Sequence, residues 1–293
     1  MTLPFVSVVI PVFHHAARLE SCLESLEGQT YPGDRYEVIV VNNGREGEIE
    51  RLVERFGRTQ VGHELRPSQF AARNRGLELA RGDVIAFIDA DCIARPDWME
   101  QGVARLAAAD IVAGRIDIFS RDQGRPTAVE LYDMLTNLDQ RTYVRAGRFG
   151  ATANLFVRRA VFDTVGSFDP VTRSGGDVEW GQRAVAQGFA LDYADEARVD
   201  HPARESWWEL SAMVRRRIGG VHDLRERACT FLGIDRGILG GMIPPVRYSL
   251  ALSRDPRLGT VGERAKVVIV AFAVRYLEAA ERLRLRLGGQ SRR

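Results

Sequence analysis

The sequence predicts an α/β protein with a doubly wound, mainly parallel sheet and a helical C-terminal extension. Three observations lead to this prediction. Apolar runs rich in β-branched residues begin at Val6, Val38 and Val84, and stretches with apolar residues at helical spacing separate them. Strand runs that alternate with helices are typical of a parallel sheet covered on both faces. The last third of the chain has no such run and predicts helices instead.

The elements of the first half follow from these patterns. The apolar periodicity predicts, in order, strand 6–13, helix 17–27, strand 38–41, helix 71–80, strand 84–88 and strand 111–116. A turn is expected at Tyr31-Pro32-Gly33-Asp34, where Pro and Gly interrupt the pattern. Further along, helices are expected at residues 127–142, 160–165, 206–219 and 265–287.

The composition is that of an ordinary soluble globular protein. Of the 293 residues, 45% are hydrophobic and 27% are charged, which is enough apolar material for a core. No basic stretch followed by an apolar stretch begins the chain, so no secretory signal is expected and a cytoplasmic location is predicted. Cys22, Cys92 and Cys229 have no zinc-ligand spacing and form no disulfide framework, which fits a reducing compartment.

Charge is distributed unevenly along the chain. Residues 204–293 hold 18 Lys and Arg against 9 Asp and Glu, whereas residues 1–203 are net acidic. The basic third is therefore expected to meet an anion: a donor diphosphate, acidic lipid headgroups, or a lipid-diphosphate acceptor. Nucleic acid is not expected, because no recognised nucleic-acid motif accompanies the charge. The apolar stretch Val267–Val274 is too short to cross a bilayer, which leaves peripheral membrane contact or packing on the domain.

Asp89-Ala90-Asp91 directly follows the apolar run 84–88. Two carboxylates one residue apart repel each other unless a cation lies between them, and Mg²⁺ and Mn²⁺ favour carboxylate oxygens. Ligands of open α/β sheets bind at the carboxyl ends of the strands. The motif therefore predicts a metal–diphosphate site, and a solvated turn is the alternative.

Several other motifs occur in order around this one. They are Val8-Val9-Ile10-Pro11-Val12-Phe13, Ala72-Arg73-Asn74-Arg75-Gly76, Phe87-Ile88-Asp89-Ala90-Asp91-Cys92, Val165-Gly166-Ser167-Phe168-Asp169, Gly175-Gly176-Asp177-Val178-Glu179-Trp180 and His201-Pro202. Together they resemble the family 2 glycosyltransferases of the GT-A fold over about residues 5–220. The resemblance implies a glycosyltransferase domain at 1–220, with a nucleotide-binding half at 1–112 and an acceptor half at 113–220. Residues 221–293 would form the helical extension.

The resemblance implies roles for the acidic residues. Asp91 is expected to bind Mn²⁺ or Mg²⁺, and Asp89 to contact the metal through water or to hold the ribose. His201 is the second expected metal ligand, with a solvated loop residue as the alternative. Asp177 is the expected catalytic base. The family usually has an acid where Gly176 stands, and an N-cap is the alternative role for Asp177.

The remaining expected contacts also follow from the resemblance. The nucleotide pocket would be formed by Pro11, Val12, Phe13, Asn42 and Arg73. Asn42 departs from the usual Asp that accepts the uracil imide hydrogen, so a UDP-sugar is favoured but a GDP- or dTDP-sugar stays open. Acceptor and donor sugars would be contacted by Thr152, Asn154, Glu179 and Trp180. Glu179 is also the alternative base, and a buried core position is the alternative for Trp180. The diphosphate would be neutralised by Arg215, Arg216 and Arg217.

The expected function is a metal-dependent inverting glycosyltransferase. It would move a sugar from a nucleoside-diphosphate sugar to a hydroxyl of a glycan, lipid-linked or small-molecule acceptor in cell-surface glycan or glycoconjugate synthesis. A nucleotidyltransferase is one alternative, although Pro11-Val12-Phe13 is not the Gly-rich phosphate loop that it needs. A non-catalytic sugar-nucleotide-binding relic is a second one.

Overall fold

A computed structural model describes residues 3–13, 16–44, 47–122, 124–172, 174–226 and 243–291. Its contacts divide the chain into two compact units, each made of two segments. Unit 1 comprises residues 1–117 and 138–201, and unit 2 comprises residues 118–137 and 202–293. The two units are defined by which residues pack together. The boundary at residue 220 between the expected glycosyltransferase domain and the helical extension stays a prediction. Cys229 lies outside the described residues.

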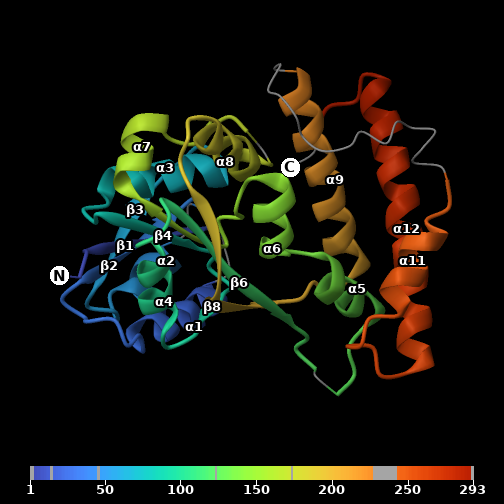
Figure 1. The fold of residues 1–293 in the computed structure, drawn as a ribbon, viewed down its shortest axis with the longest axis horizontal. Coiled ribbons are helices and arrows are strands. Elements are labelled where there is room, and N and C mark those ends of the chain that lie inside the picture. Colours follow the sequence, from blue (N-terminus) through green and yellow to red (C-terminus); the bar gives the residue numbers. More distant parts are fainter. Residues whose placement is uncertain are drawn as a thin grey trace. The chain divides into compact units, whose positions relative to one another are not determined.

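Unit 1 is built around a mixed eight-stranded sheet in the order β3-β2-β1-β4-β7-β6-β8-β5 (Figure 1). Its strands are β1 Val6–Val12, β2 Tyr36–Asn42, β3 Thr59–His63, β4 Val84–Ile88, β5 Ile93–Ala94, β6 Ile111–Phe119, β7 Asn154–Arg158 and β8 Leu191–Pro202. β1 pairs in parallel with β2 and β4, and β2 with β3. β7 is antiparallel to β4 and β6, and β5 to β8. The three predicted apolar runs thus form the parallel half.

Helices cover both faces of this sheet, which explains why β1, β2 and β4 are apolar and buried. The helices of unit 1 are α1 Ala16–Glu27, α2 Glu48–Val53, α3 Gln69–Leu79, α4 Trp98–Arg105, α6 Gln140–Thr142, the π-helix Tyr143–Gly147, α7 Arg159–Val165 and α8 Gly176–Ala186. α1, α2 and α4 lie on one face, and α3, α7 and α8 lie on the other (Figure 1). The sheet therefore has a separate apolar core on each side.

The prediction of one helix over residues 127–142 is wrong. The first helix ends at Thr136, Asn137 is extended (φ −105°, ψ 152°), and Leu138 has a positive φ of 51°. Asp139 then caps α6 by accepting a hydrogen bond from the Thr142 N–H at 3.1 Å. The break is thus stabilised by a new N-cap after a left-handed residue, and no Gly or Pro marks it in the sequence.

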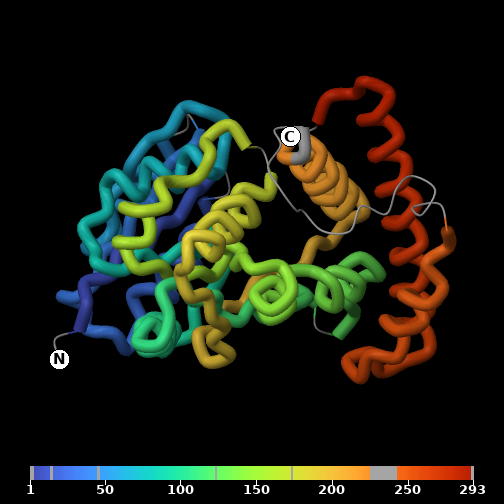
Figure 2. Tube along the Cα trace, turned by 45° about the horizontal axis from the view of Figure 1, so that its top comes forward, coloured from blue at the N-terminus to red at the C-terminus, as the bar shows by residue number. Residues whose placement is uncertain are grey.

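Unit 2 is helical. It contains α5 Ala128–Thr136, α9 Trp207–Glu226, α11 Val246–Ser253 and α12 Val261–Arg286. α9 (orange) and α12 (red) run side by side, and α5 and α11 also pack on α12 (Figure 2). Capping boxes start α5 at Thr127 and α12 at Thr260. Among the described helices, none has an apolar stretch long enough to cross a membrane.

Candidate active site

Several of the predicted site residues lie at the carboxyl ends of β1, β2 and β4. Phe13 follows β1, Asn42 ends β2, and Asp89 follows β4. The Asn43 N–H donates to the Val12 carbonyl at 2.8 Å and ties the first two strand ends together. Because these strands are parallel neighbours, their carboxyl ends meet at one edge of the sheet. This is the edge at which open α/β sheets bind ligands.

Arg73 is a buried cation beside the first acid of the Asp-Ala-Asp motif. Its side chain is 2% exposed, and its Nη2 donates to Asp89 Oδ1 at 2.7 Å. The guanidinium also lies 5.6 Å from the centre of the Phe70 ring. Within the described part of the chain, Arg73 Nε and Nη1 are buried and have no hydrogen-bond partner. Buried donors without a partner are rare, so this guanidinium is suited to bind oxygen atoms of a ligand.

Asp91 and His201 lie next to each other although they are far apart in the sequence. β5, which begins two residues after Asp91, pairs with the end of β8 that carries His201. His201 Nε2 lies 3.6 Å from Asp91 Oδ1, and Arg18 Nη1 lies 3.6 Å from Asp91 Oδ2. The motifs did not point to Arg18, because a single Arg on a helix carries no signature. A carboxylate oxygen beside an imidazole nitrogen suits Mn²⁺, which accepts both kinds of ligand.

Cys92 is the third group near these two residues. The potential ligand atoms of Asp91, Cys92 and His201 lie within 4.8 Å of one another. However, burial raises the pKa of the Cys92 thiol well above its ordinary value, and the charges of Asp89 and Asp91 raise it further. Its Sγ donates to the Ala153 carbonyl at 3.8 Å, and sulfur is a poorer match than oxygen for Mg²⁺ and Mn²⁺. The residues therefore fit a divalent cation held by Asp91 and His201, with further positions open to phosphate oxygens and water.

Asp177 lies in the first turn of α8 and is not its N-cap. Gly175 occupies the cap position with a left-handed φ of 81°, so the alternative in which Asp177 caps the helix is wrong. Asp177 Oδ1 accepts a hydrogen bond from the Val178 N–H at 3.0 Å. Burial raises the pKa of the Asp177 carboxyl above its ordinary value, while the charge of Arg73 and the hydrogen bond from Val178 oppose the shift. A carboxylate with a raised pKa is a better proton acceptor than an ordinary one.

The structure explains the glycine at position 176. A Cβ atom there would lie 2.8 Å from two carbon atoms of the Phe70 ring. The same ring contacts Phe168, at 5.7 Å between centroids, and carries Arg73 over its face. The start of α8 therefore packs directly on α3, and a larger residue would push it away. This close packing brings Asp177 into electrostatic range of Arg73 and Asp89.

Replacing Gly176 by alanine is expected to lower the free energy of unfolding by about 1–3 kcal/mol, because the new methyl group overlaps the Phe70 ring. A displacement of Asp177 on the order of 1 Å should also lower kcat about 100-fold. Urea unfolding and donor turnover measure the two effects. Gly57→Ala is the matched control, because no atom lies within 4 Å of a Cβ at that position. Equal losses in both variants would contradict the proposed packing role.

Asn42 belongs to a polar cluster that the motifs did not reveal. Its Oδ1 accepts from the Gly44 N–H at 2.8 Å, and its Nδ2 donates to Glu50 Oε1 at 2.9 Å. His63 Nδ1 lies 3.6 Å from the same Glu50 oxygen. Glu50 Oε2 is buried and has no hydrogen-bond partner among the described residues. Glu50 thus brings a carboxylate from α2 next to Asn42. No motif indicates it, because it lies on a short helix that the sequence pattern does not predict.

Two predicted sugar contacts lie in the core. Asn154 is fully buried, with Oδ1 accepting from Trp98 Nε1 at 2.8 Å and Nδ2 donating to two backbone carbonyls. Trp180 is 1% exposed, stacks on Phe162 at 4.6 Å, and donates from Nε1 to the Gly166 carbonyl at 2.8 Å. Both side chains use their polar groups to hold the fold, so the structure does not bring them to an acceptor.

The remaining predicted contacts are placed as follows. Glu179 forms an ion pair with Arg183 one turn later, at 2.8 Å, which leaves it a poor substitute base. Thr152 is buried at 4% exposure in the segment before β7. Arg215, Arg216 and Arg217 belong to α9 of unit 2, where Arg217 pairs with Glu278 of α12 at 2.6 Å. Their predicted contact with the diphosphate stays a prediction.

The fold is that of the GT-A class of proteins. A mannosyltransferase from Pyrobaculum calidifontis, PcManGT, solved in complex with GDP-Man and Mn²⁺, matches 96% of this chain and 88% of its own. The TM-score is 0.64 at 16% identity. This likeness shows the fold.

The family follows from the sequence comparisons. The model for glycosyl transferase family 2 matches residues 7–166. Glycosyltransferase AglE of Haloferax volcanii is 34% identical over 96% of both chains. The glucosyl-dolichyl phosphate glucuronosyltransferase of the same organism is 28% identical over 72% of this chain and 73% of its own. The chain belongs to glycosyltransferase family 2, and the predicted family and fold are confirmed.

Proposed function

We propose that this glycosyltransferase uses a divalent metal and an inverting mechanism to move a sugar from a nucleoside-diphosphate sugar to a hydroxyl group. The observation that carries the proposal is the environment of Asp177. It is a carboxyl in the first turn of α8 with a pKa raised by burial, in electrostatic range of the Arg73–Asp89 pair. Direct displacement of the diphosphate by the acceptor hydroxyl requires a base for the hydroxyl proton. It also requires groups that bind the departing diphosphate.

Each residue has a defined part in this mechanism. Asp177 accepts the proton of the acceptor hydroxyl while its oxygen attacks the anomeric carbon of the donor sugar. Arg73 donates its remaining N–H groups to donor oxygens, and Asp89 holds the guanidinium in place at 2.7 Å. Asp91 and His201 would hold Mn²⁺ or Mg²⁺. When bound, this ion supplies positive charge for the departing diphosphate.

The donor nucleotide is expected to be read at the Asn42–Glu50 cluster. A carboxylate oxygen is the natural acceptor for the imide N–H of uracil or thymine and for the N1–H and N2–H of guanine. Glu50 Oε2 offers such an acceptor beside the end of β2. The neighbour PcManGT was solved with GDP-Man. We therefore propose UDP, GDP or dTDP as the donor nucleotide, with Glu50 as the base-reading residue.

Titrating the wild-type protein with UDP, GDP and dTDP by calorimetry, with and without Mn²⁺, is expected to show metal-dependent binding of one nucleotide. Glu50→Gln should weaken that binding about tenfold, the loss expected for one hydrogen bond to a charged group. Glu54→Gln on the following turn is the matched control. Unchanged binding in Glu50→Gln would rule out Glu50 as the base reader. The absence of binding to any nucleotide would contradict the proposed function and favour the relic.

A nucleotidyltransferase and a non-catalytic relic have less support. Family membership and the lack of a Gly-rich phosphate loop after β1 argue against a nucleotidyltransferase. The relic hypothesis rests on Asn42 and Gly176. Glu50 lies beside Asn42 and offers a carboxylate there. Gly176 has a packing reason, because a Cβ at this position would overlap the Phe70 ring. Donor hydrolysis or transfer by the wild type would exclude the relic.

The acceptor is proposed to be a glycan or a lipid-linked sugar in cell-surface glycoconjugate synthesis. The support is the name of one relative, a glucosyl-dolichyl phosphate glucuronosyltransferase. A lipid-linked acceptor would require the enzyme to work at a membrane surface. The predicted cytoplasmic location stays a prediction.

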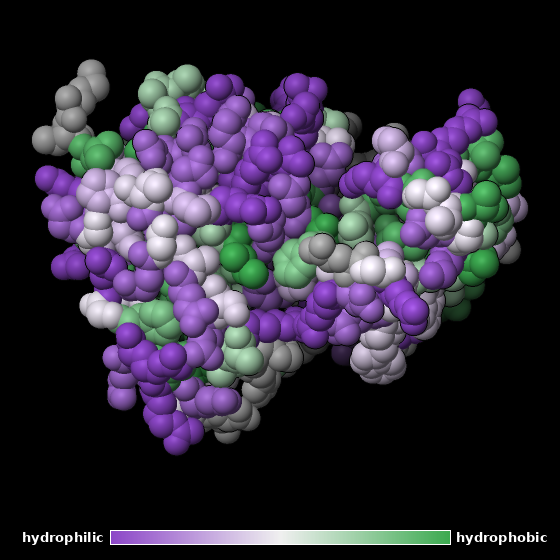
Figure 3. Space-filling view, turned by 90° about the horizontal axis from the view of Figure 1, so that it is seen from below, coloured by the Kyte–Doolittle hydropathy of each residue, from purple (hydrophilic) through white to green (hydrophobic). Residues whose placement is uncertain are grey.

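Peripheral membrane contact through unit 2 is part of this proposal. Large apolar side chains are exposed on its helices, and green residues gather on the α11–α12 side in Figure 3. The exposed large apolar side chains of α11 and α12 include Val246, Leu250, Val261, Ile269 and Leu283, and Leu287 directly after α12 is exposed as well. The basic balance of residues 204–293 would favour an anionic surface.

The protein is expected to sediment with anionic liposomes at low salt and to be released at high salt, because charge contributes to the contact. Ile269→Glu combined with Leu283→Glu should reduce the bound fraction. Leu65→Glu is the matched control, since Leu65 is 77% exposed but belongs to unit 1. No sedimentation of the wild type, or an equal loss in the control, would contradict the proposed contact.

A further inference from the structure

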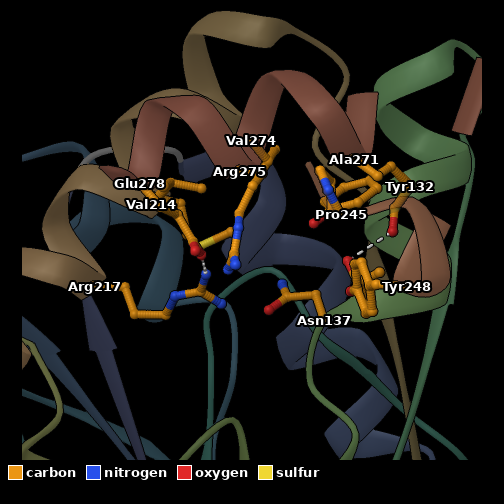
Figure 4. Close-up of a pocket in the computed structure, with 12 residues that line it drawn as sticks. Tyr132, Asn137, Val214, Arg217, Pro245, Tyr248, Ala271, Val274, Arg275 and Glu278 are labelled. Atoms are coloured by element: carbon orange, nitrogen blue, oxygen red, sulfur yellow. Dashed lines mark hydrogen bonds and ion pairs between the residues drawn. The ribbon is translucent and has the colours of Figure 1, made fainter. Parts of the chain in front are cut away.

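Unit 2 contains a cavity of about 220 Å³ that the proposed reaction does not use. Its walls come from α5, α9, α11 and α12 and from the residues next to them (Figure 4). All of the described residues that line it belong to this one unit. The volume is below the roughly 300–1,000 Å³ of drug-sized ligand pockets, so a whole sugar nucleotide would not fit.

One side of the cavity is cationic. The guanidinium groups of Arg217 and Arg275 both point into it, and Asn137 faces them (Figure 4). Among the described lining residues the acid is Glu278, which pairs with Arg217 at 2.6 Å and also lies 3.5 Å from Arg282. Among the described lining residues, two arginines stand against one glutamate, so this part of the wall has more cationic than anionic groups. This excess of cationic groups favours an anion and opposes a metal cation.

Asn137 provides an independent sign of a polar ligand. Its Nδ2 is buried and has no hydrogen-bond partner in the described part of the chain. The residue is held there by the end of α5, where its extended backbone stops the helix. A buried amide donor that faces two guanidinium groups is matched by an oxyanion, which accepts several hydrogen bonds at once.

The remaining wall is apolar and aromatic. Val214, Pro245, Ala271 and Val274 line it, and the hydroxyl groups of Tyr132 and Tyr248 bond to each other rather than leaving a polar atom unsatisfied (Figure 4). An inorganic anion alone would leave this surface without contacts. An apolar chain attached to the anion would cover it.

We infer that this cavity binds a phosphate group carried on an apolar chain. Arg217, Arg275 and Asn137 would donate to the phosphate oxygens, and the apolar wall would cover the first carbons of the chain. Arginine suits phosphate because its planar group donates two parallel hydrogen bonds. The inference concerns binding alone and goes beyond the proposed reaction, so it can fail or hold without any donor, metal or turnover.

Calorimetry with n-octyl phosphate, inorganic phosphate and n-octanol tests it on the full chain. We expect n-octyl phosphate to bind at least about tenfold more tightly than either inorganic phosphate or n-octanol. This is the minimum expected when charge-assisted hydrogen bonds are added to apolar burial. Arg217→Met and Arg275→Met should each weaken n-octyl phosphate about tenfold, for the loss of one charged donor. Arg247→Met is the matched control, because Arg247 is exposed on α11 and does not line the cavity.

A second variant separates lost binding from lost folding. Asn137→Asp is nearly isosteric and places a carboxylate opposite the two arginines, so it should weaken n-octyl phosphate while the thermal unfolding temperature stays near the wild-type value. Equal affinity for n-octyl phosphate and n-octanol would overturn the anion site. Equal affinity for n-octyl phosphate and inorganic phosphate would overturn the role of the apolar chain of the ligand. No binding, or the same loss in Arg247→Met, would overturn the inference as a whole.

Discussion

Replacing Asp177 by asparagine should lower kcat/KM for donor turnover by about 10²- to 10⁴-fold, the contribution of a positioned general base. The amide keeps the size of the side chain and its place at the start of α8 but cannot take a proton. Donor binding should be nearly unchanged, because the contacts proposed for the nucleotide belong to other residues. Donor hydrolysis or transfer measures the first effect, and calorimetry with the nucleotide measures the second.

Glu179→Gln is the control for this prediction. Glu179 lies two residues after the base position on the same helix but is held by Arg183 at 2.8 Å. Turnover in this variant should stay within a few-fold of the wild type. A large loss in Glu179→Gln together with retained activity in Asp177→Asn would reverse the assignment of the base.

The same substitution of Asp177 should stabilise the fold at neutral pH. Burial raises the pKa of Asp177 in the folded protein, so the folded state holds this proton more tightly than the unfolded state. As pH rises from the unfolded pKa of about 3.9 through the higher folded pKa, ionisation lowers the free energy of unfolding. The asparagine side chain carries no such charge. Urea unfolding at pH 7 should therefore show Asp177→Asn to be more stable than the wild type, although its turnover is much lower.

Replacing Asp91 by alanine has the second large expected effect. If Asp91 and His201 hold the metal, losing the carboxylate should cost several kcal/mol of diphosphate stabilisation, or roughly 100-fold or more in metal-dependent nucleotide affinity. His201→Ala should produce a smaller loss of the same kind. Nucleotide titration at a series of Mn²⁺ concentrations measures both variants.

Asp34→Ala is the matched control, because Asp34 is a 78% exposed carboxylate in a turn of the same unit. It should bind nucleotide and Mn²⁺ like the wild type. If Asp91→Ala kept the full Mn²⁺ dependence, the metal would have to bind elsewhere. If Asp91→Ala lost binding equally with and without Mn²⁺, the role of Asp91 would be to hold Arg18 rather than a metal.

The parallel half of the sheet could be predicted from the sequence because β1, β2 and β4 are continuous apolar runs. β3 was missed because Thr59–His63 alternates polar residues with a glycine and looks like a loop. The break after Thr136 was missed because Leu138 takes a left-handed conformation without glycine. Such features depend on tertiary contacts, and a local pattern does not encode them.

The site shows the same division. Motifs and chain order indicated Asp91, His201 and Asp177, and the structure places each at one edge of the sheet or at the adjoining end of α8. The pattern does not tell which side of a segment faces inward. Asn154 is predicted to contact the sugar but lies in the core, and for Trp180 the structure shows the core position that the sequence leaves as the alternative. Glu50 and Arg18 lie on helices, where a single charged residue has no signature of its own.

The two-segment make-up of unit 2 sets an order of events during protein synthesis. α5 leaves the ribosome well before its partner α12, which spans residues 261–286 near the end of the sequence. At about 5–20 residues per second, α5 has to wait on the order of ten seconds for that partner. During this interval Val129, Leu131 and Tyr132, which are buried in the finished protein, remain without α12 and are open to chaperones. Synonymous codon changes that slow translation after residue 137 should therefore lower the yield of folded protein more than equal delays placed after α12.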